Sequence, residues 1–161
     1  MFNKILVATD LLENCDPVVL VAAEIADQHK GMLHLIHILE SGYSAQYRNV
    51  VKDFKTGEEL VSNEEYETMV KEQIKSPYIW ILKDPEHYKI RIRPGFPWEE
   101  ILRWARKKKP ELIVLGPHPG RAEAKGVTRV SSMVGSTIEG VITHERCPVM
   151  IVNRYIPGER L

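Results

Sequence analysis

The chain alternates between short apolar runs and longer segments whose apolar residues recur at helical spacing, and this pattern predicts a mixed α/β fold. Residues 4–9, 33–39, 112–115 and 149–152 form runs typical of strands, and the first and third are apolar enough to be buried on both faces of a sheet. Residues 88–93 instead alternate apolar with basic side chains. We therefore expect that strand to have one solvated face and to lie near a sheet edge.

Helices are predicted between these strands. Asp16 and Pro17 are typical of a helix start, with the aspartate as N-cap and the proline at the first helical position. Ser62 and Glu65 form a capping box before another helix, which Pro77 should kink or split into two pieces. The remaining predicted helices span residues 98–108 and 132–143.

The order of these elements predicts one doubly wound α/β domain, an open sheet of five parallel strands with helices on both faces. The domain should span residues 1–154, with a variable loop at 40–61 and a C-terminal tail at 155–161. A loop of this length is typical of a lid, a contact surface or a partly mobile segment.

Such sheets bind ligands beyond the carboxyl ends of the strands, at the point where the strand order reverses. If the first and fourth strands flank that point, Asp10 meets the loop that follows Leu115. This loop contains Gly116 and Gly120, carries basic residues, and leads to Gly135 at a predicted helix start. The free N–H groups and the dipole of a helix start favour anions, so this stretch is a candidate phosphate site.

Composition and charge exclude several classes of protein. The 161 residues are 43% apolar and 27% charged, which is typical of one globular domain. Lys plus Arg and Asp plus Glu number 22 each, so no net charge attracts nucleic acid or an anionic membrane. The basic run at residues 106–109 ends a predicted helix, where it complements the helix dipole. We therefore expect neither nucleic acid nor a membrane as a partner.

The sequence also indicates a cellular location. The first residues lead directly into a strand, which leaves no room for a signal peptide. The apolar segment at residues 18–26 contains Glu24 and is too short to span a bilayer. Cys15 and Cys147 are too few for a disulfide scaffold or a cysteine metal site. We expect a cytoplasmic protein without a metal site.

Five segments taken together resemble the universal stress protein family: ILVATD at 5–10, GFPWEEI at 95–101, ELIVLG at 111–116, GS at 135–136 and CPV at 147–149. The resemblance covers nearly the whole chain. It implies a five-stranded Rossmann-like fold, frequent homodimers and, in one branch of the family, binding of ATP or AMP at the switch point. The family also contains a branch that binds no nucleotide.

In the nucleotide-binding branch, an aspartate after the first strand and a residue late in the second contact adenine and ribose, and a loop of pattern G-x2-G-x9-G-[ST] wraps the phosphates. The resemblance therefore implies ATP or AMP, with Mg, as a cofactor, while no cofactor at all stays an open alternative. The candidate contacts are Ala8, Thr9, Asp10, Ile38, Gly95, Leu115, Gly116, His118, Gly120, Gly135, Ser136 and Thr137.

The middle of the loop departs from the family pattern. Three residues instead of two separate Gly116 from Gly120, and fourteen instead of nine separate Gly120 from Gly135. Pro117 and Pro119 lack the N–H groups that would face a phosphate. Three outcomes follow: the extra residues bulge outward from a working phosphate loop, only the adenosine contacts survive, or the pocket is closed.

We expect a dimeric stress-response regulator that binds adenine nucleotide at the carboxyl ends of the first and fourth strands. The alternative is a protein-interaction module of the same fold that binds no nucleotide, with partners that the sequence does not identify. A slow nucleotide hydrolase is a third and less favoured reading. The absence of a G-x-x-x-x-G-K-[ST] loop and of a nucleophile beside His118 argues against it.

The last predicted strand indicates how a dimer would form. It is apolar on both faces although it should lie at a sheet edge, and such an edge favours pairing with a second copy. The pairing residues would be Val149, Met150, Ile151 and Val152.

Overall fold

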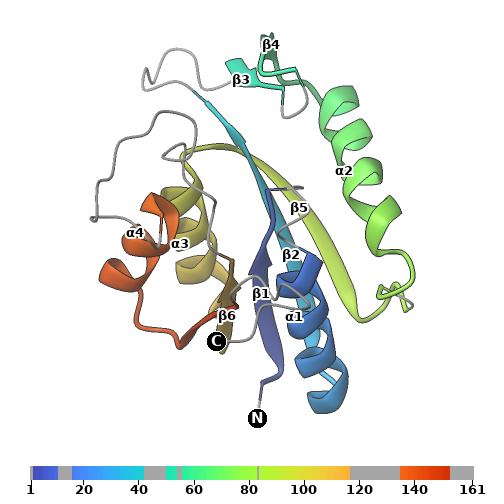
Figure 1. Cartoon of the computed structure of the whole chain (residues 1–161), viewed down its shortest axis with the longest axis vertical. Coiled ribbons are helices and arrows are strands. Elements are labelled where there is room, and N and C mark those ends of the chain that lie inside the picture. Colours follow the sequence, from blue (N-terminus) through green and yellow to red (C-terminus); the bar gives the residue numbers. More distant parts are fainter. Residues whose placement is uncertain are drawn as a thin grey trace, which may run out of the picture.

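A computed structural model gives the fold and describes residues 2–10, 16–41, 50–53, 56–82, 84–116 and 135–152. Five strands form one parallel sheet in the order β5-β2-β1-β6-β7 (Figure 1). Their bounds are β1 (Lys4–Ala8), β2 (Met32–Glu40), β5 (Tyr88–Gly95), β6 (Leu112–Leu115) and β7 (Val149–Ile151). The predicted five-stranded parallel α/β fold is confirmed, and β5 lies at a sheet edge as its alternating pattern predicted.

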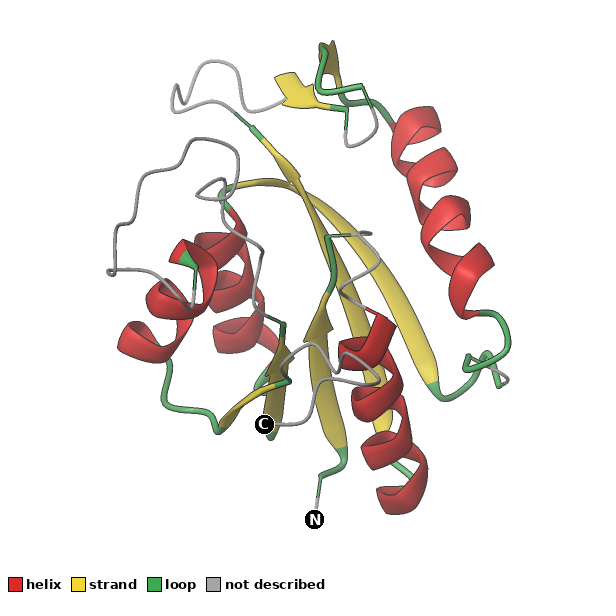
Figure 2. Cartoon of the chain, viewed as in Figure 1, coloured by secondary structure: helices red, strands yellow, loops and turns green. Residues whose placement is uncertain are grey.

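Helices cover both faces of the sheet (Figure 2). Alternate residues of each strand face opposite sides, so every central strand contributes to two cores. Ile5 and Val7 join the core under α1 (Asp16–His29) and α2 (Glu64–Tyr78). Leu6 joins the core under α3 (Pro97–Lys108) and α4 (Ser136–His144). The central strands are therefore buried on both faces, which explains their apolar sequences.

The described parts of the segment at 40–61 include two strands, where the sequence predicted a variable loop. β2 continues to Glu40, and β3 (Val50–Lys52) pairs antiparallel with β4 (Glu59–Val61). Asp53 closes the turn between them, because its carboxylate accepts the Thr56 N–H at 2.8 Å and its own N–H donates to the Glu58 carbonyl at 2.9 Å. Strands of three residues are too short to give a recognisable apolar period, which is why the prediction missed them. Residues 42–49 lie outside the described residues.

Two helix starts differ from the prediction. Asn63, not Ser62, is the N-cap of α2, since its side-chain oxygen accepts the Tyr66 N–H at 2.8 Å. The Ser62 hydroxyl instead donates to Glu67 at 3.3 Å. Asp16 is the first residue of α1 and not its N-cap. Asparagine caps as well as serine does, so the sequence alone could not choose between neighbours.

Two other helix boundaries differ as well. Pro77 does not begin a second helical piece: α2 ends one residue later at Tyr78, and residues 79–81 form a turn. Only Tyr78 follows the proline in the helix, so the backbone hydrogen bond that Pro77 cannot donate belongs to the last turn. α4 begins at Ser136, while residues 132–134 of the predicted helix lie outside the described residues. Over the described parts of the chain, no helix combines the length and apolar character needed to cross a membrane.

His34 is a buried polar residue in β2. Its side chain is 7% exposed, its ring lies 4.7 Å from that of Trp104, and its Nδ1 has no hydrogen-bond partner among the described residues. Burial, followed by the nearby cations Lys4, Lys89, Arg91 and Lys108, lowers the pKa of His34 to about 4. The imidazole is therefore neutral in the folded protein at neutral pH.

This burial predicts a stability that depends on pH. Unfolding returns the His34 pKa to about 6.5, so the unfolded chain takes up a proton that the folded protein does not, and stability falls as pH drops from about 6.5 towards 4. The free energy of unfolding of the wild type should fall between about pH 7.5 and pH 5. That of His34→Leu should fall by about 1–2 kcal/mol less over the same range. Urea unfolding at both pH values measures this difference. Equal losses in the two proteins would contradict it.

Candidate functional site

The strand order reverses between β1 and β6. β1 pairs with β2 on one side and with β6 on the other, and the ladder matches Val7 with Val114. Residues that follow these pairs leave the sheet at the same end. The structure therefore brings Ala8, Thr9 and Asp10 to the end of the sheet where Leu115 and Gly116 lie, as expected if the first and fourth strands flank the switch point.

A buried histidine fixes the backbone at this end of β1. His37 lies on β2, three residues before its last residue Glu40, is 4% exposed, and places its Nδ1 2.8 Å from the Thr9 carbonyl oxygen. The Thr9 N–H donates to the Ile36 carbonyl at 3.0 Å. Burial lowers the pKa of His37, although the Thr9 carbonyl and the Asp10 carboxylate oppose this effect. A neutral ring whose Nδ1–H donates to Thr9 thus holds the residue that precedes Asp10.

His37 was missed by the sequence analysis. The sequence signal that could have identified it is a polar ring within the apolar run at residues 33–39, close to the carboxyl end of the strand. Buried polar side chains usually have a hydrogen-bonding task, and here that task is to join the ends of β1 and β2.

The first turn of α1 lies against the end of β6. A Cβ added to Gly116 would stand 2.5 Å from Cγ2 of Val18, so only glycine allows this approach without a shift of the Val18 side chain. The amino end of a helix carries positive partial charge and free N–H groups. The switch point therefore lies beside one helix start, which favours an anion.

The candidate residues of α4 form a second helix start. Gly135 is the N-cap with φ of 81°, a conformation that favours glycine, and its carbonyl accepts the Glu139 N–H at 3.1 Å. Ser136 and Thr137 follow in the first turn. No side chain caps this start, so the Ser136 hydroxyl is not used as the cap.

The remaining candidate residues differ in position. Ile38 is half-buried beside Ala8 in the core under α3 and α4. Gly95 is not at the switch point, because it lies on β5, two strands from β1, level with Glu40. Its φ of 145° and the 2.7 Å that would separate an added Cβ from the Glu100 Cγ indicate a role in turning the chain into α3. His118 and Gly120 lie outside the described residues.

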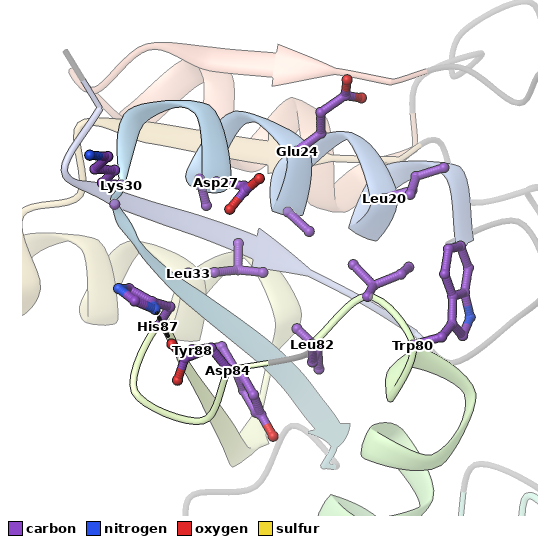
Figure 3. A pocket seen from close by; sticks show the side chains of 14 residues that line it. Leu20, Glu24, Asp27, Lys30, Leu33, Trp80, Leu82, Asp84, His87 and Tyr88 are labelled. Carbon is purple, nitrogen blue, oxygen red and sulfur yellow. Dashed lines mark hydrogen bonds and ion pairs between the residues drawn. The ribbon is translucent and has the colours of Figure 1, made fainter.

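A separate groove of about 540 Å³ lies near the other end of the sheet. Figure 3 shows α1 and the segment before β5 as its two sides, with Leu33 between them and Trp80 at the end opposite Lys30 and His87. The His87 ring lies 2.8 Å from the Asp84 carboxylate. None of the described candidate residues lines this groove, and Leu33 stands at the amino end of β2. The groove is therefore distinct from the switch point.

Metal ligands are not gathered anywhere in the described ranges. Within them, no group of three His, Cys, Asp or Glu side chains could hold an ion. The Cys147 Sγ lies 3.1 Å from the Pro110 carbonyl, and burial, followed by the charges of Glu145 and Glu111, raises the pKa of this thiol to about 11. Cys147 is therefore a protonated structural residue at neutral pH.

Comparisons with known proteins agree with this architecture. Residues 1–153 match the model of the universal stress protein family. Universal stress protein G of Shigella flexneri is 23% identical over 153 residues, covering 94% of this chain and 99% of the relative. Universal stress protein UspA from Lactobacillus plantarum superposes with a TM-score of 0.67 at 17% identity, covering 94% and 99% of the two chains. The universal stress protein from Archaeoglobus fulgidus in complex with dAMP gives a TM-score of 0.60 at 20% identity, covering 93% and 97%.

Proposed function

Because this chain belongs to the universal stress protein family, we propose that it is a cytoplasmic stress-response regulator that binds an adenine nucleotide, ATP or AMP, at the carboxyl ends of β1 and β6. The observation that carries the proposal is the meeting of Asp10, Gly116 and the start of α1 at the switch point. The complex of the Archaeoglobus relative with dAMP supports the same ligand class.

Each part of the site has a task in this proposal. The Asp10 carboxylate accepts hydrogen bonds from the ribose hydroxyls, and His37 holds the backbone that carries it. Ala8 and Ile38 offer apolar contact to adenine. The N–H groups of the first turn of α4, from Ser136 onward, bind phosphate together with the preceding loop.

The site is proposed to bind and not to turn over nucleotide rapidly. Fast phosphoryl transfer in P-loop proteins uses a G-x-x-x-x-G-K-[ST] segment to place a lysine and a magnesium ion against the phosphates, and the sequence has no such segment. The bound nucleotide would then act as a signal that changes the surface presented by the loop after β6.

Replacing the Asp10 carboxylate should weaken nucleotide binding. Asp10→Asn keeps the shape of the side chain but loses the charge that strengthens the ribose hydrogen bonds, so we expect the dissociation constant for Mg-ATP to rise about 10-fold to 100-fold. Isothermal titration calorimetry measures this constant. Asp84→Asn is the matched control, because it makes the same change at the opposite end of the sheet and should leave the affinity unchanged.

Two results would contradict the proposal. If wild-type protein binds no ATP or AMP at millimolar concentration, the reading as an interaction module without nucleotide replaces it. If Asp10→Asn and Asp84→Asn bind as the wild type does, the nucleotide lies elsewhere.

We also propose that the protein is a homodimer formed through β7. Among the described residues, β7 is the last strand of the sheet and pairs with β6 on one side only. Met150 and Ile151 are 37% and 39% exposed, so this edge offers apolar side chains to a partner strand. Antiparallel pairing of residues 149–152 with the same strand of a second copy would bury them and use the open edge.

A charge on this edge should separate the dimer. Met150→Glu places two like charges in the proposed interface, so we expect a monomer at micromolar concentration, measured by light scattering. Ile142→Glu is the control, since Ile142 is also exposed but lies on α4. A wild-type monomer, or a dimer that survives Met150→Glu, would remove the proposal.

A further inference from the structure

The exposed face of β5 carries a row of positive charge. In the ladder, Lys89, Arg91 and Arg93 stand beside His34, Ile36 and Ile38. Paired residues of parallel strands point to the same face, and Ile36 and Ile38 belong to the core on the α3 face. The three cations therefore share the α3 face, are all exposed, and lie about 6.6 Å apart along the sheet edge.

α3 continues this positive surface. The helix lies against β2 and β5, and the exposed cations on it include Arg103, Arg106 and Lys107. At 3.6 residues per turn, Arg103 and Lys107 share the side of the helix on which Glu100 contacts Gly95 of β5. The Glu100 carboxylate is buried and paired with Arg103. Lys89, Arg91, Arg93, Arg103, Arg106 and Lys107 together form what we call the basic strip.

The basic strip ends on two stacked rings. The rings of Trp98 and His144 lie 5.5 Å apart at an interplanar angle of 23°. Trp98 is held against α4, because a Cβ added to Gly140 would stand 2.6 Å from the Trp98 ring. His144 is exposed, and the Trp98 ring lies against only one face of its ring. This ring pair and three of the cations line a hollow of about 640 Å³. Its seven lining residues are Trp98, Glu99, Leu102, Arg103, Arg106, Lys107 and His144.

The basic strip lies on a chain that is neutral overall. α2, on the opposite face of the sheet, has Glu64, Glu65 and Glu67 in its first turn. The nearby Lys89 and Arg91, with Lys4 and Lys108, act together in lowering the pKa of His34, although burial is the larger cause. Net charge, on which the exclusion of nucleic acid rested, does not reveal that these six cations lie on adjoining elements, although α3 also has Glu99 and Glu100 in its first turn.

We propose that the basic strip binds single-stranded nucleic acid, with its phosphates along the cations of β5 and α3 and a base stacked on His144. Proteins that bind single strands combine a positive track with aromatic stacking surfaces, and both are present here on adjoining elements. An acidic peptide would use the cations but would have no need of a flat ring pair. The strip uses none of the switch-point residues, so this proposal does not depend on nucleotide binding.

Fluorescence anisotropy of a short fluorescein-labelled oligothymidylate tests the track of cations. The double variant Arg91→Glu with Lys107→Glu should lower the affinity at least 10-fold and reduce the slope of log affinity against log salt by about 1.4 over about 50 to 200 mM KCl. Lys71→Glu with Lys75→Glu makes the same change of net charge on α2, and the loss of affinity should be less than twofold. Equal losses in the two double variants would overturn the proposal, because net charge alone would then explain binding.

Stacking is tested with a second probe that has no bases. His144→Ala should weaken oligothymidylate binding several-fold and leave the affinity for inorganic polyphosphate unchanged. If His144→Ala changes neither affinity, or lowers both equally, His144 does not stack on a base. If polyglutamate competes as well as the oligonucleotide does, the strip is a surface for acidic proteins and the proposal fails. Asp10→Asn should bind the oligonucleotide as the wild type does.

Discussion

The pairing of β1 with β2 on one side and β6 on the other is the constraint on which the rest of the structure depends. From β1 the chain adds β2 and then β5 on one side of the sheet. It then returns to the other side of β1, where it adds β6 and then β7. Because crossovers between parallel strands are right-handed, the change of direction puts α1 and α2 on one face and α3 and α4 on the other. The connections after β1 and β6 leave the sheet in opposite directions at this point, which is where sheets of this kind bind ligands.

The parts of the fold that the sequence predicted are those governed by burial over several residues. The runs around Val7 and Val114 had to be central strands, and the basic alternation around Arg91 had to be an edge. The features that the sequence did not predict depend on local contacts. The β3–β4 hairpin depends on the Asp53 turn, and the start of α2 depends on which of two neighbouring residues caps it. Neither choice leaves a periodic pattern in the sequence.

Some residues of the candidate site could likewise be predicted from the sequence, and others could not. Asp10 and Gly116 follow strands that the apolar pattern identified, so their meeting depended on strand order alone. Gly95 was predicted as a ligand contact, and the structure shows a role that the sequence did not indicate, since its conformation turns the chain into α3. His37 was hidden within a strand because its partner, the Thr9 carbonyl, is a backbone group that no residue pattern reveals. Charge behaved likewise, since the basic surface of β5 and α3 arises only when the fold places them together.

The proposed function depends on adenine nucleotide binding where β1 and β6 end. Titration of isotope-labelled protein with AMP, followed through the backbone amide signals in NMR spectra, tests it most directly because it reports position as well as binding. We expect the largest shifts at Thr9, Asp10, Gly116 and Ser136, with little change at Trp80 or Leu82 in the groove beside α1. Shifts concentrated on Trp80 and Leu82, or no shifts at millimolar AMP, would contradict it.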